Sequence, residues 1–167
     1  MPGSLRGLWP VFTGLEGSLM GNFELDINKF IKKCGDNADK VVRKTMFDLT
    51  KSIVERSPVG NPEMWANPDA KPEGYAGGHF RANWQLGVDS MPAGIIEGID
   101  PTGTATLSKA QEAIPVKAAG HVYYYANNLP YAISLEEGHS HQAPSGMVGL
   151  AEVEFQGIIN KATAELK

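Results

Sequence analysis

The stretch from Asn127 to Val148 contains several proline and glycine residues that restrict the backbone, and it constrains the fold more than any other part of the chain. Pro130 fixes φ and lacks a donor, which suits the first turn of a short helix. Gly138 stands where that helix would end in a left-handed residue. Pro144 and Gly146 predict a turn just before a helical pattern resumes. The stretch therefore predicts a strand, a helix of one or two turns, an ordered loop and a long helix in close succession.

Residues 26–56 have a helical period, because apolar side chains recur at steps of three and four. Asp26 is a candidate N-cap, Gly35 and Asp36 could kink or split the helix, and Pro58 ends it. The opposite face is basic and could meet DNA, but interleaved acidic residues favour a solvated face. The apolar positions are Ile27, Phe30, Ile31, Cys34, Ala38, Val41, Val42, Thr45, Met46, Leu49 and Ile53.

Three segments in the middle of the chain are candidate strands. Phe80 to Val88 alternates apolar and polar residues, and Ile95 to Ile99 is a second, short candidate. The third is His121 to Ala126, which is bulky on both faces and is therefore predicted to be the central strand.

Two further helices are predicted. One spans Thr106 to Ile114 with Thr106 or Ser108 as its cap, and the other runs from Met147 to Leu166. The predicted fold class is α+β, a small antiparallel sheet packed by a long N-terminal helix and a C-terminal helix.

Residues 57–79 form a long loop rich in proline and glycine, and such loops in compact domains are usually functional or mobile. The aromatic residues Trp65 and Tyr75 are candidate docking anchors there. An equally good reading is that Trp65 folds back to cover the edge of the core.

The composition bounds the function of the 167 residues. A formal charge of −4 argues against a domain that binds nucleic acid by neutralising phosphates, and a single cysteine, Cys34, excludes an intrachain disulfide. No apolar run reaches membrane-spanning length, and the N-terminus is a poor signal peptide.

Residues 1–19 are either a translated leader before a natural start at Met20 or a flexible arm, and residues 20–167 are predicted to form one domain.

The one cluster that invites catalytic chemistry is Glu136, Glu137, His139 and His141. Histidine and glutamate can ligate zinc, so a small metal-dependent hydrolase is one alternative. The histidines lack the i, i+4 helical spacing of zinc hydrolases, and neither a nucleophile elbow nor a phosphate loop is present. We therefore expect no metal, no cofactor and no enzyme, and a generic protein-binding module is a further alternative.

Three passages together resemble the tail-completion, or neck, proteins of long-tailed bacteriophages, of the minor tail protein Z type. They are Ser57-Pro58-Val59-Gly60, Phe80-Arg81-Ala82-Asn83-Trp84 and the block from Asn127 to Val148, read as NNLPYA, LEEGHS and QAPSGMV. The chain departs from the family pattern in its long 60–78 insertion. The resemblance implies a structural virion protein, made in the bacterial cytoplasm, that completes the tail and joins it to the filled head.

What the resemblance implies about assembly is a homo-oligomeric ring between the head connector and the tail terminator or tube. We expect a hexamer, with a dodecamer as the alternative. DNA passes through such a ring without sequence-specific binding, and we expect acidic or neutral side chains on its lumen. The predicted contact residues are Trp65, Tyr75, Leu129, Tyr131, Glu136, His139, His141 and Met147.

Overall fold

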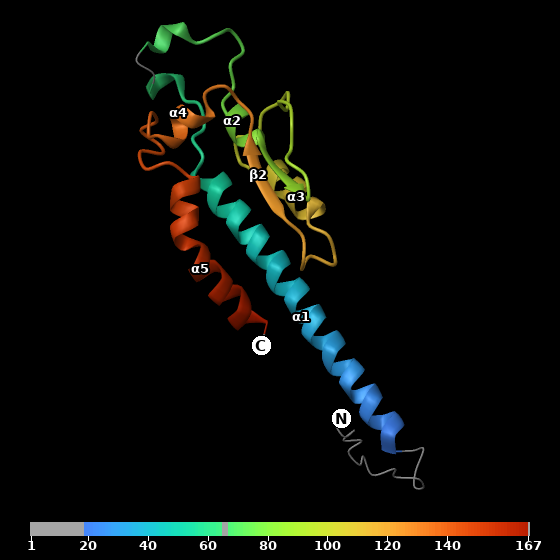
Figure 1. Ribbon diagram of the computed structural model, residues 1–167. Helices are drawn as coiled ribbons and strands as arrows, with labels where there is room; N and C mark the ends of the chain where they lie inside the picture. Colours follow the sequence, from blue (N-terminus) through green and yellow to red (C-terminus); the bar gives the residue numbers. More distant parts are fainter. Residues whose placement is uncertain (1–18, 65–66, 167) are drawn as a thin grey trace, which may run out of the picture. The chain divides into compact units, whose positions relative to one another are not determined.

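The computed structural model describes residues 19–64 and 67–166, so the predicted leader falls outside it except for its last residue. Helices precede, separate and follow the two strands of the chain (Figure 1). In order they are α1 (Leu19–Arg56), η1 (Pro62–Met64), η2 (Pro68–Ala70), α2 (His79–Ala82), β1 (Trp84–Val88), α3 (Thr104–Ala113), β2 (Tyr123–Asn127), α4 (Ala132–Glu136) and α5 (Val148–Glu165).

The chain divides into two compact units, and the boundary falls inside α1, between Cys34 and Gly35. α1 is helical without interruption from Leu19 to Arg56, so the helix is not split at Gly35 and Asp36. All contacts described below belong to the unit that begins at Gly35.

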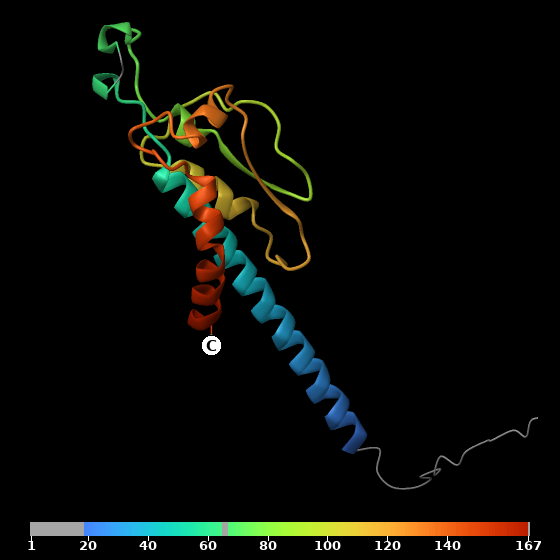
Figure 2. The same cartoon turned by 60° about the vertical axis from the view of Figure 1, so that its left-hand side comes forward.

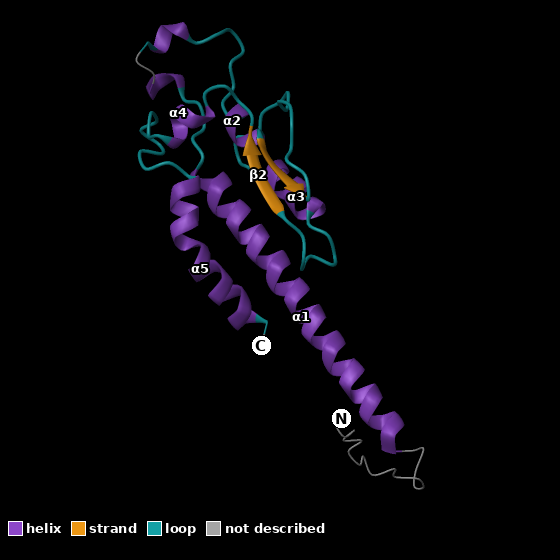
Figure 3. Cartoon of the chain, in the orientation of Figure 1, coloured by secondary structure: helices purple, strands orange, loops and turns teal. Residues whose placement is uncertain are grey.

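β1 and β2 form an antiparallel pair in which Trp84 lies opposite Asn127 and Val88 opposite Tyr123 (Figure 3). Both strands are half-buried along their whole length. The small antiparallel sheet and the α+β class are confirmed. The central position predicted for the third strand was wrong, because within the described residues β2 pairs with β1 alone.

The core lies where α1, α2, the loop after α4 and the start of α5 meet. Its buried members are Ile53, Phe80, Leu129, Ala143, Met147 and Ala151. The Tyr125 hydroxyl donates to the Met46 carbonyl at 2.7 Å and accepts from Thr50 Oγ1 at 2.9 Å, which fixes β2 on α1. Burial raises the pKa of Tyr125 to about 12, so the phenol keeps the proton that it donates.

α5 runs beside the later half of α1, as the two views in Figures 1 and 2 agree. Ala151 and Ala162 are the buried residues of α5 within the described chain. Arg56 and Glu154 form an ion pair at 2.7 Å near one end, and Lys44 and Glu165 form another at 3.0 Å near the other end. Two buried alanines and two ion pairs therefore hold α5 in place.

Two strand predictions were wrong in part or entirely. The first residues of the predicted 80–88 strand form the single turn α2, which follows Gly78 in a left-handed conformation with φ 107°. The 95–99 segment is irregular. The backbone N–H and carbonyl of Ile96 form hydrogen bonds with the side chain of Asn83 and not with a neighbouring strand. Asn83 Oδ1 accepts from Ile96 N at 2.8 Å, and its Nδ2 donates to Ile96 O at 3.0 Å.

The helices predicted at 106–114 and 147–166 are confirmed within two residues as α3 and α5. The predicted cap of α3 was wrong. Gly103 holds the N-cap position, and the carboxylate of Asp100 accepts from the backbone N–H of Gly103 and of Thr106 at 2.9 and 2.8 Å. No helix in the described ranges has an apolar run long enough to cross a lipid bilayer.

Candidate functional site

A cavity of about 420 Å³ opens beside α4. Its walls come from the 58–64 segment, from Tyr75, from the start of α2 and from the loop after α4. Four of the predicted contact residues line it together: Tyr75, Tyr131, His139 and His141. Trp65 lies outside the described residues, so both readings of it stay predictions.

Ser57 holds the first wall of this cavity in place. Its carbonyl accepts from Arg81 Nη2 at 2.7 Å, and its hydroxyl accepts from Trp84 Nε1 at 2.7 Å. The same hydroxyl donates to the Ile53 carbonyl at 2.8 Å. The bonds from Arg81 and Trp84 to Ser57 therefore tie the end of α1 to the α2–β1 segment. Arg81 Nη1 also donates to Pro101 O at 2.6 Å, in the loop before α3.

Gln142 closes the cavity on the other side. Its Oε1 accepts from Val59 N at 3.1 Å, and its Nε2 donates to Val59 O at 2.8 Å. The side-chain amide thus pairs with a peptide group as a neighbouring strand would. Gln142 was not among the predicted site residues.

Two of the histidine rings that line the cavity each have one nitrogen in a hydrogen bond with a backbone carbonyl. His79 Nδ1 lies 2.7 Å from Gly98 O, and His139 Nδ1 lies 2.8 Å from Ser134 O. A carbonyl oxygen can only accept, so each Nδ1 carries the hydrogen and Nε2 remains for a ligand. Among the described residues no group of three or more histidine, cysteine or acidic side chains is placed to hold a metal ion.

The two tyrosines bring hydroxyl groups to the same cavity. Burial, and after it the neighbouring Tyr75, raises the pKa of Tyr131. The Tyr131 ring lies 6.1 Å from the Phe80 ring, centroid to centroid. Tyr75 packs against Gly60, where an added Cβ would collide with the phenol oxygen. The Tyr131 phenol therefore keeps its proton near neutral pH and can donate a hydrogen bond.

Glu136 points away from this cavity, toward the N-terminus of α5. Its Oε2 accepts from Met147 N at 2.9 Å and from Val148 N at 3.0 Å, and its Oε1 accepts from Gly149 N at 2.9 Å. Burial alone would raise the pKa of Glu136, but the three N–H groups together outweigh burial and lower it. The carboxylate thus satisfies the free donors of α5 and favours its positive end.

The contact role predicted for Leu129 and Met147 does not fit their burial. Leu129 is 6% exposed and Met147 is 0% exposed, and both belong to the core. Their burial in the core, and not a contact with another chain, accounts for apolar residues at these two positions.

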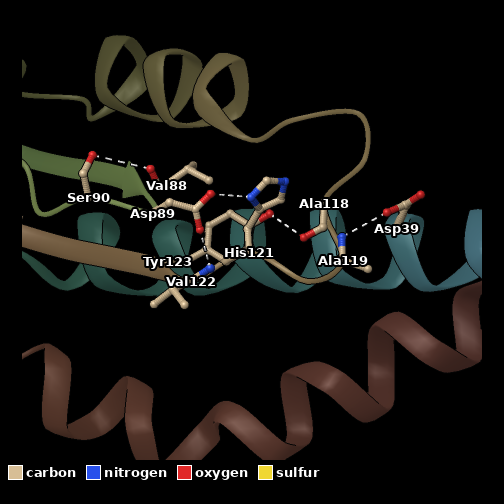
Figure 4. A network of polar contacts seen from close by, with 9 residues as sticks. All are labelled: Asp39, Val88, Asp89, Ser90, Ala118, Ala119, His121, Val122 and Tyr123. Atoms are coloured by element: carbon tan, nitrogen blue, oxygen red, sulfur yellow. Dashed lines mark hydrogen bonds and ion pairs between the residues drawn. The ribbon is translucent and has the colours of Figure 1, made fainter.

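A second polar network closes the open end of the β1–β2 pair (Figure 4). Asp89, at φ 58°, accepts from Val122 N at 2.9 Å and lies 2.6 Å from His121 Nδ1. The Val122 N–H and then the His121 ring lower the pKa of Asp89. The Ser90 hydroxyl is directed to the Val88 carbonyl and not to His121, so this network supports the end of the strand pair and contains no serine–histidine relay.

No family model, no curated protein and no solved structure matches this chain in the comparisons made. What the chain does is therefore inferred from its own residues and from the resemblance described above.

Proposed function

We propose that this chain is a structural protein of a bacteriophage neck, a ring component that completes the tail and joins it to the DNA-filled head. The observation that carries the proposal is a set of contacts between the passages of the resemblance, which lie far apart in the sequence. Ser57 binds both Arg81 and Trp84, and Asn127 Nδ2 donates to Phe80 O at 2.9 Å. The passages of the resemblance are thus joined to one another in the fold, and this supports the proposal.

The exposure of α5 supports a role in assembly. This helix exposes four large apolar residues, with Val153 83% exposed, and the others are Val148, Leu150 and Phe155. An apolar hollow of about 290 Å³, lined by Leu49, Ile53, Tyr125 and Phe155 among others, lies beside it. Helices in proteins gain most of their stability from a buried apolar face, so contact with another subunit would supply what α5 lacks in the single chain.

In this proposal the copies form a closed ring, a hexamer first and a dodecamer second, between the connector and the tail. The formal charge of −4 suits a channel wall that lets DNA slide, because each cationic contact to phosphate adds affinity. The protein would reside in the virion after synthesis in the bacterial cytoplasm.

The alternative of a metal-dependent hydrolase is not favoured by the contacts of its presumed ligands. Glu136 is directed at the α5 backbone, and His139 Nδ1 at the Ser134 carbonyl. The alternative of a generic protein-binding module would present the aromatic 60–78 loop, and it differs from the neck proposal in the partner.

Deletion of the coding sequence from the phage that carries it tests the proposal. We expect filled heads and complete tails to accumulate apart, with joining restored when the protein is supplied from a plasmid. Normal yields of joined, infectious particles from the deletion phage would contradict a neck function.

A further inference from the structure

We infer that the cavity beside α4 binds a carboxylate group carried on an apolar body, and that binding takes up protons on the cavity histidines. Three histidines of the described chain, His79, His139 and His141, line it. No aspartate, glutamate, lysine or arginine is among the lining residues that the structure describes. The inference goes beyond the neck proposal and does not depend on it.

The free nitrogens of the imidazoles define the chemistry of the ligand. Nδ1 of His79 and Nδ1 of His139 are committed to carbonyls, so Nε2 is the nitrogen left in each ring. A protonated imidazole donates from Nε2, and a carboxylate is the acceptor that gains most from such a charged donor. The phenol of Tyr131 adds a neutral donor in the same cavity.

The remaining walls select the body of the ligand. Phe80, Leu135 and Val59 give the cavity an apolar lining, and Met64 borders it with 48% of its surface exposed. A carboxylate on an aromatic or branched aliphatic body matches this division between apolar walls and imidazole donors. A highly charged ligand such as a polyphosphate lacks a counterpart for its remaining charges.

Among the described residues, no acidic side chain of the surrounding elements lines the cavity beside the histidines. Glu63 of η1 and Glu137 after α4 are exposed and are not lining residues. Glu136 is held by the N-terminus of α5. A bound carboxylate would therefore be the acidic partner that favours protonation of these rings, so affinity should rise as the pH falls.

Calorimetric titration of the full chain with benzoate, at about pH 6 and about pH 8, tests this inference. We expect saturable binding that is about tenfold tighter at the lower pH, with net proton uptake. Benzyl alcohol, which has the same ring without the charge, should bind at least about tenfold more weakly at the lower pH. A short acetylated Leu-Glu-Leu peptide in a parallel titration shows whether a protein carboxylate is also accepted, and binding of either acid supports the inference.

Two variants locate the site. The double variant His139→Gln/His141→Gln should lose about tenfold in affinity for benzoate, whereas His121→Gln, at the end of the β1–β2 pair, should leave it unchanged. NMR signals of the imidazole rings in the unaltered chain give the same test without a substitution, since benzoate should shift those of His79, His139 and His141 and leave His121 in place. Absence of saturable binding by either acid, equal binding of benzyl alcohol, or perturbation of His121 alone would overturn the inference.

Discussion

At the scale of single residues, Ser57 joins more of the chain than its size suggests. It is 1% exposed, and it connects the end of α1 with Arg81 and Trp84 through three hydrogen bonds. Ser57→Ala removes the acceptor of the Trp84 N–H and should lower the free energy of unfolding by about 1–3 kcal/mol. Urea unfolding followed by tryptophan fluorescence measures the change. Ser90→Ala, which removes an exposed hydroxyl with a 3.5 Å contact, is the control, and an equal effect of both variants would contradict the role of Ser57.

Glu136 makes a second residue-scale prediction, which concerns pH. Its pKa lies below 4.5 in the folded chain, so its stabilising contribution is complete above about that pH and is lost as the pH falls through the folded-state pKa. Glu136→Gln should therefore destabilise by about 1 kcal/mol near neutral pH and by progressively less in acid. Urea midpoints across the pH range measure this difference. The neighbouring, exposed Glu137→Gln should change little at any pH, and a difference for Glu136→Gln that grows in acid would rule out this capping mechanism.

At the scale of elements, the packing of α5 on α1 depends on small residues. Ala162 is 0% exposed, and a leucine there would have to displace one of the helices. Ala162→Leu should cost about 1–3 kcal/mol of stability by overpacking. Ala164→Leu, at an exposed position on the same helix, is the matched control in thermal unfolding. Equal melting temperatures for the two variants would mean that α5 does not pack on α1 through this alanine.

The elements that sequence periodicity predicts well are those whose own residues decide them. Pro58 ends α1, and the apolar spacing after Gly146 begins α5, because both signals are local. The α2 turn and the 95–99 segment were mispredicted because a distant side chain decides them. The alternation of Phe80, Ala82 and Trp84 is typical of a strand. In the structure, however, the side-chain amide of Asn83 binds the backbone of Ile96, and the two segments do not form a ladder of backbone hydrogen bonds.

The candidate site divides in the same way. Exposed aromatic and histidine residues around Pro130 and Gly138 could be identified in the sequence, and Tyr131, His139 and His141 do meet in one cavity. His79 and Gln142 were missed because their significance depends on the fold. Gln142 binds Val59 across 83 residues of sequence, and neither residue carries a local signal for this pairing.

At the scale of the whole molecule, the neck proposal predicts that the 60–78 loop is needed for joining and not for folding. Trp65→Ala/Tyr75→Ala should leave the unfolding transition nearly unchanged but reduce the joining of tails to heads at least about tenfold, if these are anchor residues. Met91→Ala, which truncates an exposed apolar residue of a different loop, is the control. Infectious particles at normal titre from the double variant would show that the loop is not a docking element.

A cryo-EM reconstruction of the neck of the phage particle tests the central proposal most directly. We predict a closed ring of this chain between connector and tail, with six copies as the first expectation and twelve as the second. Its lumen should be lined by acidic or neutral side chains, and α5 and the 60–78 loop should lie in contacts with neighbouring chains. A neck without density for this chain, or a ring of it lined by lysines, would contradict the account.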